Sequence, residues 1–182
     1  MTPAMRYSTP AIVLHWLAAL LIFVAFPLGV YMHELPLSPG KLKLYSYHKW
    51  IGITLLMLAA LRVTWRLTHT PPPLPADMAA WQRRASQAVH GLLYVLMIAI
   101  PLSGWLMSSA KGFPTVWFGV LPLPDLVEKN RELGDLLAGV HQALNFALLA
   151  LVIMHVGAAL QHHFIERRPF LQRMGWNKQE RT

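Results

Sequence analysis

Residues 141–164 read HQALNFALLALVIMHVGAALQHHF, an apolar stretch that is interrupted by four histidines. The longer run 136–165 contains no Asp, Glu, Lys or Arg. An α-helix needs about 20 apolar residues to span the hydrocarbon core of a bilayer, so this run predicts a transmembrane helix. Histidines inside such helices are uncommon and usually mark a function.

Three other segments have the same apolar character, and the composition agrees with them. Of the 182 residues, 55% are hydrophobic and only 13% are charged, whereas a soluble domain carries about 25% charged residues. The mean hydropathy is +0.40. We therefore predict an all-α membrane protein, a bundle of four transmembrane helices. The helices are expected near residues 10–32, 46–67, 84–109 and 137–164, in one integral membrane domain that covers 1–182 and ends in a cytoplasmic tail at 165–182.

The chain has no cysteine, which excludes disulfides, iron–sulfur clusters and thiol catalysis. Its net charge of +8 suits either nucleic acid or an anionic membrane surface, and the places of the basic residues decide between the two. One set of helix ends carries Arg6, Arg62, Arg66, Arg83, Arg84, Arg167, Arg168, Arg173, Lys178 and Arg181. The other set carries Lys41, Lys43, Lys49, Lys111, Lys129 and Arg131.

The second set is smaller and is interspersed with acidic residues. Because the cytoplasmic loops of membrane proteins carry the excess of Lys and Arg, the first set predicts the cytoplasmic side. Both termini are then cytoplasmic. The same bias accounts for the basic charge of a protein in contact with membrane lipid, so no nucleic-acid partner is expected.

The spacing of histidines in the fourth helix suggests a cofactor. His141 and His155 are fourteen residues apart, which is just under four turns and a rise of about 21 Å. They therefore share one face of the helix at two depths, and this spacing predicts two haems stacked in the bundle. His48 lies level with His141 and is its expected partner. For His155, both His15 and His90 lie at a suitable depth, and the spacing does not choose between them.

A histidine-lined carrier of metal ions is the alternative from another class of protein. Such a pathway would call for acidic or sulfur ligands, and none of the four predicted spans contains Asp or Glu. Small residues beside the histidines (Gly52, Gly91 and Gly157) would let a flat porphyrin approach the backbone, or they serve helix packing.

The sequence resembles the bacterial cytochrome b561 family, the four-helix, di-haem proteins of the cytoplasmic membrane, over nearly its whole length. The motifs that carry the resemblance are His15-Trp16, His48 with Gly52, Arg62 with Arg66, His90-Gly91, Pro101 with Gly104, His141-Gln142-Ala143-Leu144-Asn145, His155, His162-His163-Phe164 and Leu171-Gln172-Arg173-Met174. One departure is the tail Glu166-Arg167-Arg168-Pro169, where relatives often have an acidic residue after the paired histidines. The tail contacts of the family are therefore not carried over.

The resemblance implies two non-covalent haem b groups in the bacterial inner membrane, each held by two histidines. The inner haem would be held by His15 with His155, and the outer haem by His48 with His141. His90 and His162 are left as non-ligands and as candidates for a ubiquinone site.

An iron atom with two imidazole ligands has no vacant position, which favours one-electron transfer over oxygen activation. Some members of the family are superoxide oxidases, which pass electrons from periplasmic superoxide to ubiquinone, and this is the activity we expect. The candidates for steering superoxide by their charge are Lys41, Lys43, Lys49 and Lys111. The alternative is a di-haem electron-transfer subunit that links the quinone pool to a partner redox protein.

Overall fold

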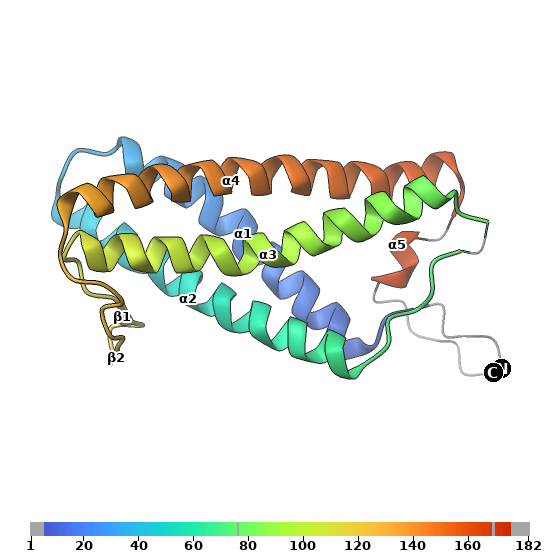
Figure 1. The fold of residues 1–182 in the computed structure, drawn as a ribbon, viewed down its shortest axis with the longest axis horizontal. Coiled ribbons are helices and arrows are strands. Elements are labelled where there is room, and N and C mark those ends of the chain that lie inside the picture. The colour runs from blue at the N-terminus through green and yellow to red at the C-terminus, as the bar shows by residue number, and fades with distance from the viewer. Residues whose placement is uncertain (1–5, 76, 169, 176–182) are drawn as a thin grey trace.

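Four long helices dominate the computed structural model, which describes residues 6–75, 77–168 and 170–175 (Figure 1). They are α1 (Thr9–Glu34), α2 (Pro39–Thr68), α3 (Ala80–Ala110) and α4 (Arg131–Leu160). Each is long and apolar enough to cross a membrane, and few of its residues are buried inside the protein. The expected four-helix membrane bundle is confirmed.

The helices pack in chain order, with α1 against α2, α2 against α3 and α3 against α4. The best-buried cluster brings Ala18, Ala59 and Met97 together from the first three helices, and small side chains of this kind allow close helix packing in membranes. Close backbone approach between α1 and α4 is sparse. We call this side of the bundle the α1–α4 seam.

The helices extend beyond the ends expected from hydropathy, most of all where α2 and α4 begin. Ser38 caps α2 by accepting a hydrogen bond from the Lys41 backbone N–H at 3.2 Å, with Pro39 as the first helical residue. Asn130 caps α4 by accepting one from Leu133 at 3.0 Å. Capping groups and an N-terminal proline start helices in polar sequence, so the loops expected at 33–45 and 110–136 shorten to 35–38 and 111–130.

A short hairpin, β1 (Val116–Trp117) with β2 (Leu121–Pro122), covers one end of the bundle, which we call the hairpin end (Figure 1). Phe118 and Gly119 form its turn with φ of 50° and 72°. The indole N–H of Trp50 donates to the Val116 carbonyl at 2.7 Å. The hairpin is thereby attached to α2 two residues after His48.

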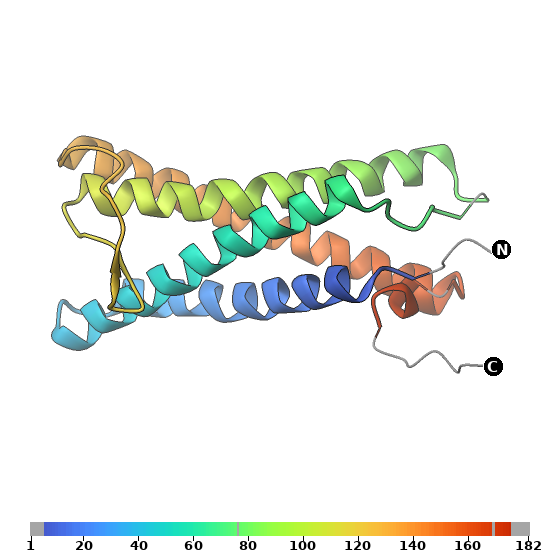
Figure 2. The same ribbon diagram turned by 90° about the horizontal axis from the view of Figure 1, so that it is seen from below.

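The opposite end, the terminal end, brings the two ends of the described chain together (Figure 2). After α4 the chain makes a π-helical turn, η1 (Gln161–Ile165), and a short helix, α5 (Phe170–Arg173). The Tyr7 backbone N–H donates to the Arg173 carbonyl at 3.1 Å, and the Trp16 indole N–H to the Met174 carbonyl at 2.9 Å. Of the basic residues assigned to this end, Lys178 and Arg181 lie outside the described residues.

Candidate functional site

The expected outer ligands meet across the bundle near the hairpin end. His48 of α2 and His141 of α4 have ring centroids 6.3 Å apart, with ring planes inclined at 82°. Their helices are not direct neighbours in the packing order, so the two side chains cross the interior of the bundle. The structure brings together the two residues that the sequence placed at one level.

The separation of these rings matches the space that one metal atom needs between two imidazoles. A metal–imidazole bond is about 2.0 Å long and a ring centroid lies about 1.1 Å behind its nitrogen, so two imidazoles on opposite sides of one iron have centroids roughly 6.3 Å apart. The pair also supplies the nitrogen donors that hold iron in b haems. By spacing and donor type, His48 and His141 fit a haem.

The hydrogen bonds of His141 occupy Nδ1 and leave Nε2 free to bind a metal. Its Nδ1 atom lies 3.0 Å from the Ile100 carbonyl oxygen and 3.0 Å from the Ser103 hydroxyl, both on α3. A carbonyl only accepts, so Nδ1 carries the proton and the lone pair lies on Nε2. This arrangement, in which one ring nitrogen donates to a carbonyl and the other binds the metal, is typical of metal-bound histidine.

Two glycines that the sequence analysis did not single out as site residues lie against the outer histidines. A Cβ atom on Gly29 of α1 would lie 3.2 Å from the His48 ring, and one on Gly104 of α3 would lie 3.0 Å from the His141 ring. Contacts that short force the ring to move. The absence of side chains at these positions therefore lets both imidazoles occupy the interior.

Three histidines gather at the inner position instead of two. The His155 ring of α4 lies 6.2 Å from the His15 ring of α1 and 5.1 Å from the His90 ring of α3. The first separation equals the two-imidazole spacing to within about 0.1 Å, whereas the second is too short for two imidazoles on opposite sides of one metal atom. The His90 Nδ1 atom lies 2.6 Å from the Ser86 carbonyl of its own helix.

Arg62 of α2 touches the inner cluster. Its Nη2 atom lies 3.3 Å from Nδ1 of His15. A guanidinium only donates hydrogen bonds, so in this arrangement Nδ1 of His15 accepts and Nε2 carries the proton. Metal binding at Nε2 therefore requires Arg62 to leave His15, which makes the fit of the inner pair to a haem depend on this arginine.

Open space lies beside the three glycines expected to let a porphyrin approach. A Cβ atom on Gly52, Gly91 or Gly157 would meet no atom within 4 Å. A larger cavity of about 870 Å³ lies at the terminal end between the start of α1 and the end of α2. Arg62, Arg66 and Tyr94 line this cavity, and neither His90 nor His162 does.

The four lysines proposed to steer superoxide lie at the hairpin end, and three of them are held by polar partners. Lys41 donates to the His33 carbonyl at 3.1 Å. Lys49 donates to the Pro114 carbonyl at 2.8 Å and contacts the Ser108 hydroxyl at 3.2 Å. Lys111 pairs with Asp135 at 3.3 Å. The fourth, Lys43, is exposed and lies over the Tyr47 ring at 5.8 Å.

Comparison with known proteins finds similar sequences over most of the chain. The family model described as prokaryotic cytochrome b561 matches residues 6–177. Cytochrome b561 homolog 2 of Escherichia coli K12 is 37% identical over 171 residues, covering 93% of this chain and 90% of the relative. Homolog 1 of the same organism is 28% identical, covering 93% and 96%. A probable superoxide oxidase, CybB of Yersinia pestis, is 27% identical, covering 93% and 95%.

Proposed function

Because this chain belongs to the prokaryotic cytochrome b561 family, whose members bind b haems and transfer electrons across the membrane, we propose that it is a superoxide oxidase of the bacterial inner membrane. The overall reaction is 2 O₂•⁻ + Q + 2 H⁺ → 2 O₂ + QH₂, where Q is ubiquinone. The observation that carries the proposal is the pair of histidine contacts at two depths along α4, His48 with His141 and His15 with His155.

In this proposal each pair would hold one haem b, without a covalent link because the chain has no cysteine. When bound, the two haems would carry single electrons between the hairpin end and the terminal end. The Ile100 carbonyl orients the His141 ring so that its Nε2 atom would face the haem. The packing of Gly29 and Gly104 against the rings restricts how the outer imidazoles turn.

The hairpin end is assigned to the periplasm and the terminal end to the cytoplasm, on the bias of basic residues. The basic residues of the hairpin end are interspersed with acidic ones, so steering of an anion is assigned to individual exposed lysines, which raise its encounter rate in a salt-dependent way. Lys43 is the strongest of the four steering candidates, since its ammonium group is exposed and is not bound to a carboxylate among the described residues. Lys41, Lys49 and Lys111 contribute charge while they also hold loops.

Ubiquinone is proposed to accept electrons near the terminal end, with His90 and His162 as candidate groups for its oxygens. His90 lies against the His155 ring, so a quinone beside it would be close to the inner pair. The cavity lined by Arg66 and Tyr94 is the competing location for the quinone head group. Substitutions at His90 and Tyr94 distinguish the two locations, since only a substitution at the site that binds quinone changes the KM for quinone.

A second candidate is a di-haem electron-transfer subunit that passes electrons between the quinone pool and a partner protein. The observation that favours it is the exposed apolar tip of the hairpin, formed by Phe118, Val120 and Leu121. Apolar groups gathered on an exposed surface mark interaction sites. In that case the hairpin end would bind a protein instead of a small anion.

The test is a reaction with the purified protein alone in detergent or liposomes. Superoxide loss faster than its spontaneous dismutation, with one quinol formed for every two superoxide molecules, is the expected result. A protein with haem absorption bands that does not react with superoxide would support the electron-transfer subunit. A protein without haem bands in the reduced-minus-oxidised spectrum would contradict both candidates and favour a carrier.

A further inference from the structure

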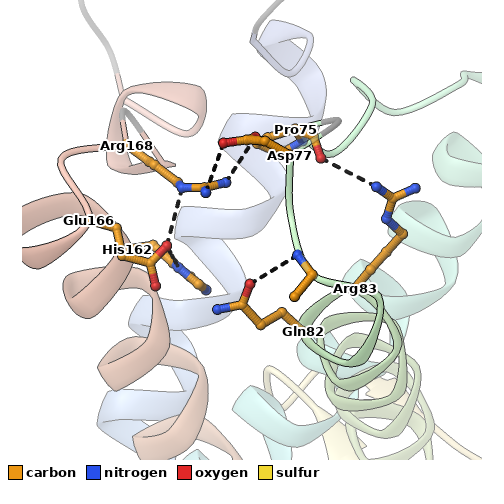
Figure 3. A network of polar contacts seen from close by, with 8 residues as sticks. Pro75, Asp77, Gln82, Arg83, His162, Glu166 and Arg168 are labelled. Atoms are coloured by element: carbon orange, nitrogen blue, oxygen red, sulfur yellow. Dashed lines mark hydrogen bonds and ion pairs between the residues drawn. The ribbon is translucent and has the colours of Figure 1, made fainter.

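A polar chain begins where α4 ends (Figure 3). The π-helical turn η1 places Nδ1 of His162 at 3.0 Å from a carboxylate oxygen of Glu166, one turn later in the chain. The two side chains are 14% and 23% exposed, respectively.

The other partners of Glu166 lead outward to the surface. Arg168 Nε lies 3.2 Å from the same Glu166 oxygen, Oε2. The guanidinium of Arg168 also binds both carboxylate oxygens of Asp77, at 2.9 and 3.2 Å. Asp77 lies in the linker between α2 and α3 and is 74% exposed. Figure 3 shows Arg168 between the two carboxylates, so the linker is joined to the end of α4.

The inner end of this polar chain is His162, which comes after the inner histidine His155 in the sequence. His162 follows His155 by seven residues, which is about two turns and 10 Å along a helix. Its ring stacks on the Phe170 ring of α5 with centroids 4.9 Å apart. The guanidinium of Arg173 lies 5.6 Å from the centroid of the same Phe170 ring. His162 therefore has one carboxylate partner, one apolar partner and a cation beyond the apolar one.

We propose that Glu166 and His162 form a proton relay that carries protons from the cytoplasmic water to the quinone. This inference rests on the proposed function, because a quinone becomes a quinol only by taking two electrons and two protons. In each transfer, His162 gives a ring proton to a quinone oxygen, a new O–H bond forms, and Glu166 returns a proton taken from water to the imidazole. The electrons come from two superoxide ions, which leave as O₂.

Arg168 and Asp77 have a different part in this proposal. A guanidinium does not release a proton in proteins, so Arg168 cannot pass protons along the chain. It is a positioning residue, which holds the Glu166 carboxylate beside His162 by an ion pair. Asp77 holds Arg168 in turn through one hydrogen bond and one ion-pair contact.

The test separates proton transfer from electron transfer. The haem-loaded protein is reduced and then mixed in a stopped-flow instrument either with a soluble ubiquinone, which needs protons, or with ferricyanide, which takes an electron alone. We expect Glu166→Gln to slow oxidation by quinone at least about tenfold, since general acid catalysis is worth about 10²–10⁴-fold and water replaces part of it. Oxidation by ferricyanide is expected to be unchanged. Glu166→Asp is expected to recover part of the quinone rate.

The pH dependence and a matched substitution complete the design. Glu166→Gln is expected to change the pH profile of the quinone rate and to enlarge its solvent deuterium isotope effect. Glu132→Gln, the same change on an exposed side chain at the hairpin end, is expected to leave both unchanged. Asp77→Asn keeps both relay groups and is expected to slow the quinone rate less than Glu166→Gln does.

Three results would overturn the inference. Wild-type rates with quinone in Glu166→Gln would mean that water protonates the quinone directly. Equal losses with quinone and ferricyanide would mean that Glu166 is only structural. An unchanged pH profile and isotope effect despite a slower quinone rate would mean that proton delivery is not what Glu166 provides. Failure of the wild-type protein to reduce quinone at all is a separate result, which contradicts the proposed function itself.

Discussion

The Ile100 carbonyl oxygen lies 3.0 Å from Nδ1 of His141, and this contact joins α3, which carries no proposed outer ligand, to α4, which carries one. The contact sets the tautomer of His141 and the direction of its Nε2 lone pair. Helix α3 therefore takes part in the outer site through a backbone atom, which no side-chain substitution removes. The contact can instead be tested by substituting Ser103 or Gly104 of α3, which lie against the same His141 ring.

The first prediction concerns the number of haems. The two histidine pairs are expected to hold two b haems per chain, measured by the pyridine haemochrome assay against protein concentration. His141→Ala is expected to lose the outer haem and to keep the inner one, since His15 and His155 are untouched. One haem per wild-type chain would contradict the two-haem proposal.

The second prediction distinguishes His15 from His90. On the ring separations of 6.2 and 5.1 Å from His155, His15→Ala is expected to lose the inner low-spin signal in electron paramagnetic resonance. His90→Ala is expected to keep both low-spin signals and to lower the rate of quinone reduction. Loss of a low-spin signal in His90→Ala alone would reverse the assignment of the inner pair.

The third prediction uses Gly104, where a Cβ atom would lie 3.0 Å from the His141 ring. Because His141 is held by the Ile100 carbonyl, its ring cannot move away freely, and Gly104→Ala is expected to lower the outer haem content.

Gly139→Ala is the matched control for that substitution, since a Cβ atom there meets nothing within 4 Å. Replacing glycine by alanine inside a helix favours folding by about 0.5–1 kcal/mol. The control is therefore expected to keep both haems and to raise the thermal unfolding temperature slightly. Equal haem content in the two variants would mean that Gly104 only serves helix packing.

The fourth prediction separates a steering charge from a structural one. Lys43→Glu is expected to slow the reaction with superoxide by roughly two- to tenfold at low salt, because a charge reversed on the approach surface lowers the encounter rate. The difference is expected to shrink near 0.15 M salt, where the Debye length is about 8 Å. Reduction by quinol from the other end should be unchanged. A rate equal to wild type at low salt would exclude Lys43 from steering.

Lys49→Met is the comparison for Lys43. It removes the hydrogen bonds of the ammonium group to the exposed Pro114 carbonyl and to the buried Ser108 hydroxyl, and a hydrogen bond of this kind contributes about 0.5–1.5 kcal/mol to stability. Its expected effect is a lower unfolding temperature at any salt concentration. A salt-dependent loss of superoxide reactivity with unchanged stability would instead make Lys49 a steering residue.

The sequence predicted the four transmembrane helices from the length of the apolar runs. It also predicted that His48 and His141 lie at the same depth, from the rise per residue of a helix. Spacing alone could not choose a partner for His155, and only the family resemblance favoured His15, since helix rotation decides that choice and two histidines at one depth look alike in a sequence. Sequence reasoning also missed the contacts of Gly29 and Gly104 with the rings. Those contacts depend on the register between helices that are distant in the chain.

The starts of α2 and α4 were misplaced for a different reason. Hydropathy measures where the hydrocarbon begins, whereas a helix begins where its first N–H groups find acceptors. Ser38 and Asn130 provide such acceptors well outside the apolar runs. The carbonyl partners of Lys41 and Lys49 were equally out of reach, because carbonyl acceptors have no signature in a sequence. The pairing of Lys111 with Asp135 depends on how the end of α3 packs against α4.

The contact between Tyr7 and Arg173 has a consequence for the biosynthesis of the protein. Helix α1 packs on α2 but meets α4 only sparsely, and at the terminal end the chain is joined across the α1–α4 seam by residues that follow α4. A ribosome makes these residues after all four helices. At the terminal end, the seam beside His15 and His155 is therefore fastened only after the residues that follow α4 have been made.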